Sequence, residues 1–193
     1  MLTLPESIPI LIVGAGPTGL SCAISLVVNG VKPQDIIIID AQPQGHNLSR
    51  AIAIHAKTLE VCLDFSVPLI IAIDPFVPQE LETMGCTEKL ISRGIQNNIF
   101  RNAAGRTTLV KADFASLSSR TNYPYILTIP QTDTEHTLEE RLTELGVLVR
   151  RPHRLAELKG LDDGVQATLE GGETIKAKFI VGADGSRSMV RKS

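Results

Sequence analysis

The chain has 193 residues, 43% of them hydrophobic, and a formal net charge of -2 at pH 7, so it is long enough to bury a core in one domain. The near-neutral balance, without a run of Lys or Arg, argues against nucleic acid or an anionic membrane surface as a partner, and no apolar stretch reaches transmembrane length. Three cysteines without disulfide or metal-ligand spacing, and an N-terminus without a secretory signal, indicate a reducing compartment, so we expect a cytoplasmic protein.

The first elements predicted along the chain form a β-α-β unit. Residues 8–13, a short apolar run rich in β-branched side chains, indicate a strand buried on both faces. Residues 18–29 then place apolar side chains at helical spacing, and Gly30 stands where a left-handed helix end belongs. The stretch "DIIIID", residues 35–40, predicts a second buried strand, parallel to the first because a helix connects the two.

The middle of the chain predicts a polar loop, a helix and then antiparallel strands. Residues 47–62, "NLSRAIAIHAKTLEVC", lead from the loop into a helical pattern. Residues 94–114 indicate two strands around a turn at Asn102–Gly105, and "YILTIP", residues 125–130, indicates a further strand. We also expect the fold to include a small β-meander.

The last part of the chain predicts one more helix followed by short strands. Thr132 and Glu135 have the spacing of a capping box, leucines follow on one helix face, and Gly146 marks the helix end. Residues 147–186 indicate short strands separated by Asp-Gly and Gly-Gly turns, with an apolar strand at Phe179–Val181. The fold class is therefore α/β, with a Rossmann-like parallel sheet and added antiparallel strands.

The stretch "LIVGAGPTGLSCAISL", residues 11–26, places Gly14, Gly16 and Gly19 in a G-x-G-x-x-G frame between the first strand and the first helix. Gly14 permits the tight turn, Gly16 lets a diphosphate approach the backbone, and Gly19 lets the helix pack against the sheet. The helix N-terminus favours the phosphates, and Asp40, at the end of the second strand, is placed to accept hydrogen bonds from ribose hydroxyls. The motif predicts a bound dinucleotide and by itself does not separate NAD from FAD.

The sequence that follows Asp40 favours FAD. An NAD-binding domain would continue with alternating strands and helices, whereas a long excursion and hairpin-like strands follow here. An NAD(P)-binding module is the less favoured alternative.

Three further motifs follow in chain order: "SRAIAIHAKTLE", "IPQTDTEHTLEERLTELGV" and "FIVGADGSRSMVRK". Together with the glycine motif they resemble the FAD-dependent aromatic-compound monooxygenases of the phenol hydroxylase and p-hydroxybenzoate hydroxylase type. The resemblance implies FAD as cofactor, NAD(P)H as co-substrate, and transfer of oxygen from O2 to a small, phenol-like aromatic substrate. It also implies that the β-α-β unit binds FAD and that other strands are part of a second, incomplete substrate-domain sheet.

The same resemblance implies cofactor contacts at the positions that match the family's motifs. Arg50 would contact the flavin, Gln131 would hydrogen-bond the cofactor near a helix start, and the pair Asp184 and Gly185 would lie near the ribityl chain and the diphosphate. These residue types suit the ligand, because a diphosphate needs cations or N–H donors and hydroxyls need acceptors such as carboxylates. The alternatives are a solvated Arg50, a Gln131 that only caps its helix, and a plain Asp-Gly turn. No residue stands out as a catalytic side chain or a metal ligand.

Two departures from the family limit the function that we expect. Residues 61–79 interrupt the predicted helix with three prolines, and either a retained intron or a genuine surface insertion would explain them. The chain also stops at Ser193, before the family's remaining substrate domain and its second nucleotide-contacting Gly-Asp motif. We therefore expect one FAD-binding domain over 1–193, incomplete at its C-terminus, and the alternative function is a truncated, non-catalytic nucleotide-binding remnant. No pattern in the residues predicts an oligomeric state.

Overall fold

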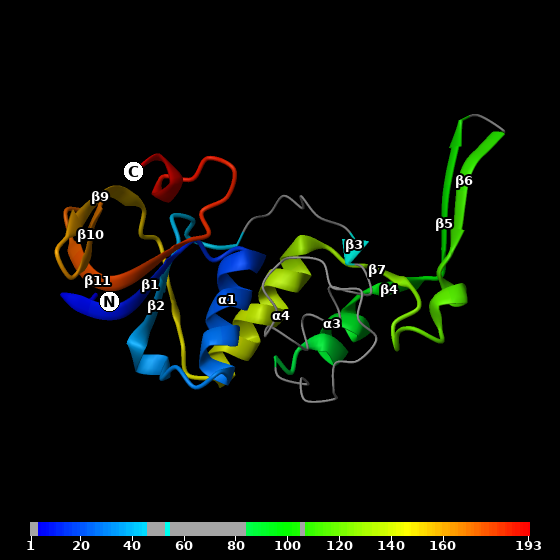
Figure 1. Cartoon of the computed structure of the whole chain (residues 1–193), viewed down its shortest axis with the longest axis horizontal. Coiled ribbons are helices and arrows are strands. Elements are labelled where there is room, and N and C mark those ends of the chain that lie inside the picture. The colour runs from blue at the N-terminus through cyan, green and yellow to red at the C-terminus, as the bar shows by residue number, and fades with distance from the viewer. Residues whose placement is uncertain (1–3, 46–52, 55–83, 105–106) are drawn as a thin grey trace. The chain divides into compact units, whose positions relative to one another are not determined.

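The computed structural model describes residues 4–45, 53–54, 84–104 and 107–193 (Figure 1). The chain divides into two compact units: Met1–Leu48 with Glu135–Ser193 make up the first unit, and Ser49–Thr134 make up the second. Arg50, the predicted insertion at 61–79 and most of the predicted loop and helix at 47–62 lie outside the described residues. A single domain over 1–193 stays a prediction.

The first unit is built on a six-stranded sheet with the strand order β8-β2-β1-β11-β10-β9. Its strands are β1 (Ser7–Val13), β2 (Ile36–Ile39), β8 (Val149–Arg150), β9 (Leu155–Leu161), β10 (Gly164–Leu169) and β11 (Thr174–Gly182). Neighbouring strands are parallel from β8 through β2 and β1 to β11, whereas β11, β10 and β9 form an antiparallel meander. The sheet confirms the predicted α/β class and its parallel β-α-β unit (Figure 1).

The two central strands are buried as their continuous apolar sequences predict. All four residues of β2 are buried, and so are Leu11, Ile12 and Val13 of β1. Leu11 lies opposite Ile37, and Ile12 lies opposite Ile38. Because successive side chains of a strand point to opposite faces, this register gives both faces of the parallel sheet an apolar layer.

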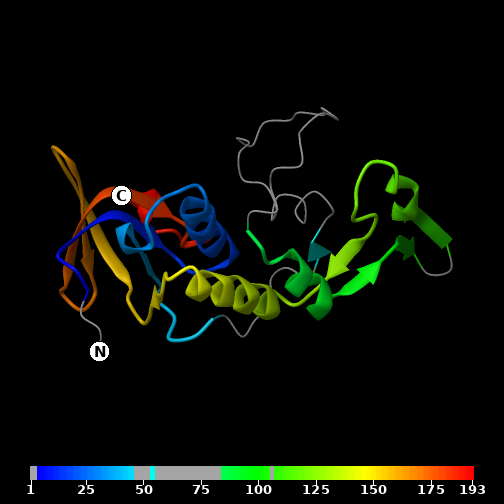
Figure 2. The ribbon, with the colours of Figure 1, turned by 90° about the horizontal axis from the view of Figure 1, so that it is seen from below.

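Helix α1 (Pro17–Val28) connects β1 to β2, and it lies on the same side of these strands as helix α4 (Gln131–Glu144) (Figures 1 and 2). It ends as predicted at Gly30, which has a φ of 95°. The N–H of Gly30 donates to the carbonyl of Val27, and the N–H of Val31 donates to that of Leu26. This pair of bonds is the Schellman motif, which satisfies carbonyls at a helix end. Among the described residues, no helix is long and apolar enough to cross a membrane.

Helix α4 begins two residues earlier than the capping-box spacing predicts. The carbonyl of Pro130 already accepts hydrogen bonds from two N–H groups of the first turn. Thr132 therefore lies inside that turn, and its prediction as the N-cap residue is wrong. The helix ends as predicted, because Gly146 takes a φ of 86° just after its last turn.

The antiparallel meander closes the core of the first unit. Its strands are separated by the predicted Asp-Gly and Gly-Gly turns, and Gly172 in the second turn has a φ of 90°. Apolar side chains from β1, β2, β9, β10 and β11 gather in one buried cluster: Ile8, Leu11, Val13, Ile37, Ile39, Leu155, Ala167, Leu169, Ile175 and Ala177. The meander therefore supplies the apolar cover for one face of the parallel strands.

The second unit contains helix α3 (Thr87–Arg93) and two small antiparallel sheets. One sheet has the order β3-β7-β4, formed by β3 (Ala53–Ile54), β7 (Ile126–Thr128) and β4 (Ile95–Asn97). The other is a hairpin of β5 (Ile99–Ala104) and β6 (Thr107–Asp113). These strands confirm that antiparallel structure follows the β-α-β unit.

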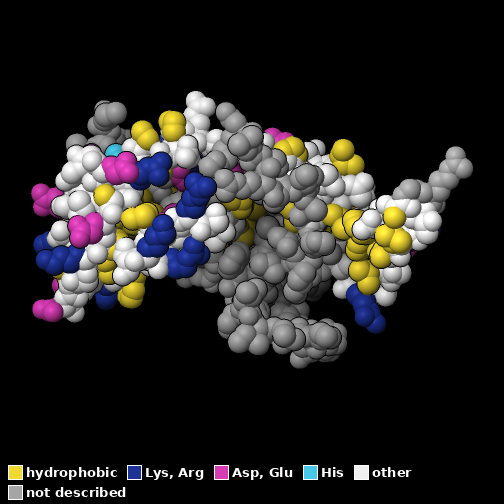
Figure 3. All heavy atoms as spheres, turned by 90° about the horizontal axis from the view of Figure 1, so that it is seen from above, with side chains coloured by type: hydrophobic (Ala, Val, Ile, Leu, Met, Phe, Trp, Pro, Cys, Tyr) yellow, Lys and Arg dark blue, Asp and Glu magenta, His cyan; other side chains and the backbone are white. Residues whose placement is uncertain are grey.

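The hairpin corrects the predicted turn at Asn102–Gly105. Asn102, Ala103 and Ala104 belong to β5, because they pair with Val110, Thr108 and Thr107 of β6, with a register irregularity after Asn102. A register irregularity of this kind lets a strand continue where the residue pattern indicates a turn. Four large apolar side chains of the hairpin are about half exposed: Ile99, Phe100, Leu109 and Val110. Figure 3 shows hydrophobic side chains on the surface of the described residues.

Gly14 offers a test of the packing at the end of β1. A Cβ at Gly14, which has a φ of 106°, would overlap the backbone of Ala183, whereas a Cβ at Gly30, with a φ of 95°, would meet nothing within 4 Å. We expect Gly14→Ala to lower the free energy of unfolding by at least about 2 kcal/mol and Gly30→Ala by about 1 kcal/mol, measured by urea denaturation. Equal losses of unfolding free energy in the two variants would show that strain in the φ angle, and not the contact with Ala183, explains the need for glycine at position 14.

Candidate nucleotide-binding site

The loop after β1 lies directly against the backbone that follows β11. The N–H of Gly14 donates to the carbonyl of Ile39 (2.8 Å), and the N–H of Ala183 donates to the carbonyl of Val13 (2.7 Å). A Cβ at position 14 would stand 2.8 Å from the backbone nitrogen of Asp184. The ends of β1, β2 and β11 are therefore held together, and only glycine fits between them.

The first backbone N–H groups of helix α1 have no acceptor among the residues that the structure describes. Gly16 is its N-cap residue, in an extended conformation with φ −77° and ψ −178°, and no side chain among the described residues caps the helix. Pro17 follows at the first helical position and has no N–H, while the first turn contains no acidic residue. The N–H groups of Thr18 and Gly19 precede the first intrahelical bond, so they and the helix dipole are available to an anion.

Gly16 and Gly19 meet different surroundings. A Cβ at Gly19 would overlap the carbonyl of Gly14 and lie 3.3 Å from the Cβ of Ala183, so this glycine permits the helix to pack on the loop. A Cβ at Gly16 would meet only Glu135 Oε1, at 3.9 Å. The space in front of Gly16 is therefore open, as close approach of a ligand to the backbone requires.

Asp40 directs its carboxylate back onto the loop. Oδ2 accepts a hydrogen bond from the N–H of Ala15 (2.6 Å), and Oδ1 accepts one from the N–H of Gln42 (2.7 Å). Each carboxylate oxygen has about two acceptor positions, so both oxygens keep a lone pair for a ligand hydroxyl. The backbone of Asp40 is held as well, since its N–H donates to Arg150 (3.0 Å) and its carbonyl accepts from His153 (2.7 Å).

Asp184 uses one carboxylate oxygen to hold the turn that follows it. Oδ2 accepts from the N–H groups of Met189 (2.6 Å) and Val190 (3.3 Å). Burial by itself raises the pKa of Asp184, but hydrogen bonds from the Ser188 side chain and from these two N–H groups outweigh it and leave the pKa below its ordinary value. The other oxygen, Oδ1, is buried and has no hydrogen-bond partner among the described residues. A buried acceptor of this kind calls for a donor, such as a ligand hydroxyl.

The structure brings most of the predicted site residues into the first unit. The loop after β1 contains Gly14, Gly16 and Gly19, and Asp40 bonds to it through the N–H of Ala15. The segment that follows β11 contains Asp184 and Gly185, and Gly185 has a φ of 79°. Gln131 is the first residue of α4 and belongs to the second unit, so its position relative to the glycine loop stays a prediction. Arg50 lies outside the described residues, so its contact with the flavin stays a prediction.

Two contributions to the site were not predicted from the sequence. The backbone groups of Arg150 and His153 bracket Asp40, and backbone contacts leave no signal in residue type. Glu135, which the sequence indicated as part of a capping box, is buried, and its carboxylate faces Gly16 and Gly45. A Cβ at Gly45 would lie 3.2 Å from Glu135 Oε2. A glutamate that is 4% exposed beside two glycines shows that Glu135 packs against the loop instead of only capping a helix.

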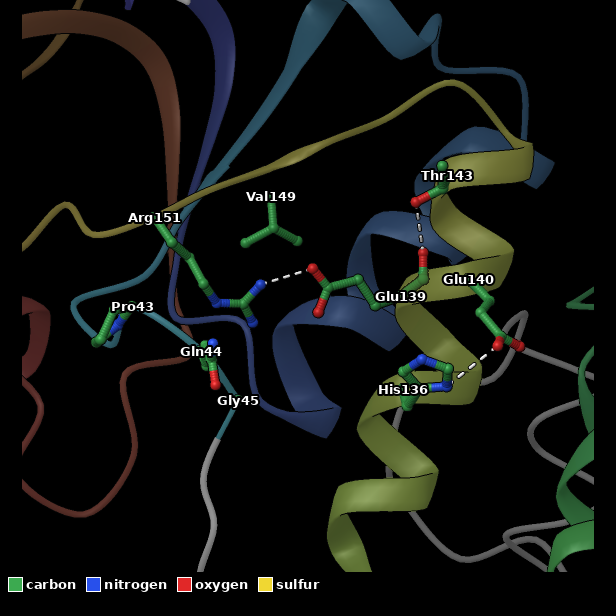
Figure 4. Close-up of a pocket in the computed structure, with 9 residues that line it drawn as sticks. All are labelled: Pro43, Gln44, Gly45, His136, Glu139, Glu140, Thr143, Val149 and Arg151. Carbon is green, nitrogen blue, oxygen red and sulfur yellow. Dashed lines mark hydrogen bonds and ion pairs between the residues drawn. The ribbon is translucent and has the colours of Figure 1, made fainter. Parts of the chain in front are cut away.

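An open pocket lies between α4, β8 and the loop that follows β2 (Figure 4). Arg151 Nη1 forms an ion pair with Glu139 Oε1 (2.6 Å) across this pocket, and His136 Nδ1 lies 3.1 Å from Glu140 Oε1. Among the described residues, no group of three or more His, Cys, Asp or Glu side chains is arranged to hold a metal ion. The chemistry available at the site is hydrogen bonding to phosphates and hydroxyls.

Comparison with known families agrees with this geometry. The family model described as "FAD binding domain" matches residues 7–68 and 78–193 of the chain. The matched ranges leave out residues 69–77, which lie inside the predicted insertion at 61–79, and the origin of that segment stays a prediction.

Individual relatives carry the same domain. The chain is 31% identical over 189 residues to rifampicin monooxygenase of Streptomyces venezuelae and 30% identical over 191 residues to pentachlorophenol 4-monooxygenase of Sphingobium chlorophenolicum, with 95% of the chain covered in each case. The crystal structure of p-nitrophenol 4-monooxygenase PnpA from Pseudomonas putida superposes with a TM-score of 0.79 at 25% identity, over 97% of this chain and 43% of that one. The chain spans about a third of the length of the two curated relatives, 33% and 31%.

The lowered pKa of Asp184 makes stability depend on pH. Because the ionised form is favoured in the folded state, Asp184 stabilises the fold above its ordinary pKa of 3.8, and this contribution is lost as the pH falls through the lower folded value. We expect the thermal midpoint of the wild type to exceed that of Asp184→Asn at about pH 6, and the difference to shrink towards about pH 3. Asp162→Asn, in the exposed β9–β10 turn, is the matched control. A difference that does not change with pH would contradict the role of the carboxylate charge.

Proposed function

Because the chain belongs to the family of FAD-dependent aromatic-compound monooxygenases and matches its FAD-binding domain, we propose that the candidate site binds the adenosine diphosphate half of FAD. The observation that carries this proposal is the uncapped start of α1, which faces open space at Gly16 and lies beside the carboxylate of Asp40. Phosphates need donors and ribose needs acceptors, and the start of α1 supplies the donors while Asp40 at the end of β2 supplies the acceptors.

Each residue of the site has a proposed part. The N–H groups at the start of α1 donate to the diphosphate, and Gly16 gives the phosphates access to them. The free lone pairs of Asp40 accept from the ribose hydroxyls. Asp184 Oδ1 accepts from a hydroxyl of the ribityl chain, which supplies the donor that this buried oxygen lacks among the described residues.

Two further contacts are proposed from the family resemblance. Arg50 would offset the negative charge of the cofactor, and Gln131 would hydrogen-bond it from the first turn of α4. The residue types support both assignments, since guanidinium and amide groups are donors to phosphate and carbonyl oxygens.

For the whole protein we propose hydroxylation of a small, phenol-like aromatic substrate. The names of the relatives support this class, since they are monooxygenases of rifampicin and of pentachlorophenol. Bound FAD supplies the redox chemistry, in which NAD(P)H and O2 are consumed, one oxygen atom enters the aromatic ring and the other leaves as water. The described residues of this chain bind and orient the adenosine end of the cofactor.

The alternative is a chain that binds nucleotide without turnover. The donors at the start of α1 and the carboxylates of Asp40 and Asp184 support a binding role. We further propose a cytoplasmic location, supported by three cysteines without disulfide spacing, of which Cys22 and Cys86 are free. The near-neutral net charge supports the absence of a nucleic acid or membrane partner.

The purified chain decides between these functions. We expect it to bind FAD in a fluorescence titration, and FMN, which lacks the adenosine half, more weakly. Accelerated NAD(P)H oxidation with a phenol, together with formation of the hydroxylated product, would support the monooxygenase. FAD binding without turnover would support the binding function, and failure to bind FAD or ADP would contradict both.

Gly16→Ala separates ligand binding from folding. The added methyl group meets nothing closer than 3.9 Å, and the φ of −77° suits alanine, so the free energy of unfolding should fall by less than about 1 kcal/mol. The methyl group occupies the space that the diphosphate needs, so the Kd for FAD should rise by about tenfold or more. Gly160→Ala, in an equally open position on β9, is the control and should leave the Kd unchanged.

Asp40→Ala tests the ribose contact. Loss of a charge-assisted hydrogen bond should weaken FAD binding by about 1.5 to 3 kcal/mol and leave FMN binding unchanged, as measured by isothermal titration calorimetry. Asp35→Ala, just before β2, is the matched control for the loss of an acidic side chain. Equal weakening of FAD and FMN would remove Asp40 from the ribose site.

A further inference from the structure

An ion pair fastens the segment after β8 to helix α4. Arg151 Nη1 lies 2.6 Å from Glu139 Oε1, and the two residues point toward each other from opposite sides of the open pocket (Figure 4). The side chain of Arg151 is only 11% exposed, whereas that of Glu139 is 38% exposed. The pair thus joins a nearly buried guanidinium to a carboxylate at the edge of the helix.

The same segment holds the backbone of Asp40 from two sides. The carbonyl of Arg150 accepts from the N–H of Asp40 (3.0 Å), and the N–H of His153 donates to the carbonyl of Asp40 (2.7 Å). Arg151 stands between these two backbone contacts in the sequence. The ion pair of Arg151 with Glu139 therefore holds residues 150–153, and this segment in turn holds the backbone of Asp40.

The ladder that joins this segment to the sheet is short. Strand β8 has two residues, and within the part of the chain that the structure describes it pairs with β2 alone, through Ile38 with Val149 and Ile39 with Arg150. Further along the segment, the N–H of Glu170 donates to the carbonyl of Arg154 (2.9 Å). Edge strands of this length contribute few ladder hydrogen bonds. The ion pair of Arg151 with Glu139 adds to these backbone contacts a side-chain contact from helix α4.

Stability alone does not explain the pair. Burying a guanidinium is costly, and Arg151 Nε is buried with no hydrogen-bond partner among the described residues. Apolar side chains of similar size would stabilise such a site at least as well. A directed ion pair instead fixes a geometry, because its two groups must meet at defined positions.

We propose that Glu139 and Arg151 are positioning residues for Asp40: their ion pair sets the path of residues 150–153 and thereby the orientation of the carboxylate toward the ribose. This proposal rests on the proposed binding of the adenosine half of FAD. The carboxylate itself bonds to the N–H groups of Ala15 and Gln42, so a shift of the Asp40 backbone would move its oxygens relative to the glycine loop. Neither positioning residue needs to touch the ligand.

The test compares ADP with 2′,3′-dideoxy-ADP, which lacks the hydroxyls that Asp40 would accept from. Kd values for both are measured by isothermal titration calorimetry on the full chain and on Glu139→Gln. We expect Glu139→Gln to raise the Kd for ADP about three- to tenfold and to leave the Kd for the dideoxy compound within about twofold. Glu140→Gln is the matched control, since Glu140 lies next to Glu139 on α4 and its carboxylate lies 3.1 Å from His136 Nδ1.

The ratio of the two Kd values distinguishes positioning from a structural role. A purely structural loss would lower the thermal midpoint and weaken both ligands equally, which would overturn the proposal, as would an unchanged ratio in Glu139→Gln. Glu139→Asp, which keeps the charge but withdraws it by one methylene, gives the same comparison if Glu139→Gln does not fold. A wild-type chain that binds neither ADP nor FAD would overturn the proposed function, and this inference with it.

Discussion

The backbone of the loop after β1 lies against the backbone that follows β11, and the candidate site depends on this contact. The N–H of Ala183 donates to Val13, and there is no room for a side chain at position 14. The parallel pairing of β1 with β11 sets this approach, so the turn into α1 is forced to be tight. As a consequence, the start of α1 and the carboxylate of Asp184 belong to one edge of the sheet, although they are distant in the sequence.

The second constraint is the double support of Asp40. Its side chain is held by the glycine loop and its backbone by the segment after β8, so β1, β2 and β8 all contribute to one carboxylate. A flavin nucleotide needs such rigid placement because the cofactor carries the chemistry and the protein supplies orientation. The family membership and the geometry therefore agree on the adenosine diphosphate half, while the reaction of the whole protein is a proposal.

The sequence predicted the parts of the fold that depend on residue type. Continuous apolar runs predicted β1 and β2, and glycines with positive φ predicted the ends of α1 and α4, because each of these features demands particular side chains. The N-cap at Thr132 and the turn at Asn102–Gly105 were wrong, because the Pro130 carbonyl and the continued β5–β6 pairing act through the backbone. The contacts of Arg150 and His153 with Asp40 were missed for the same reason, since any residue supplies a carbonyl or an N–H.

The most direct measurement is the change in backbone amide chemical shifts of the 15N-labelled chain on titration with ADP. The account predicts the largest changes at the amides of Thr18 and Gly19 at the start of α1, together with those of Ala15 and Gln42, which donate to Asp40. The amides of the β5–β6 hairpin should not move. Changes that leave the start of α1 unaffected and appear elsewhere, or no changes at saturating ADP, would contradict the assignment of this loop as the nucleotide site.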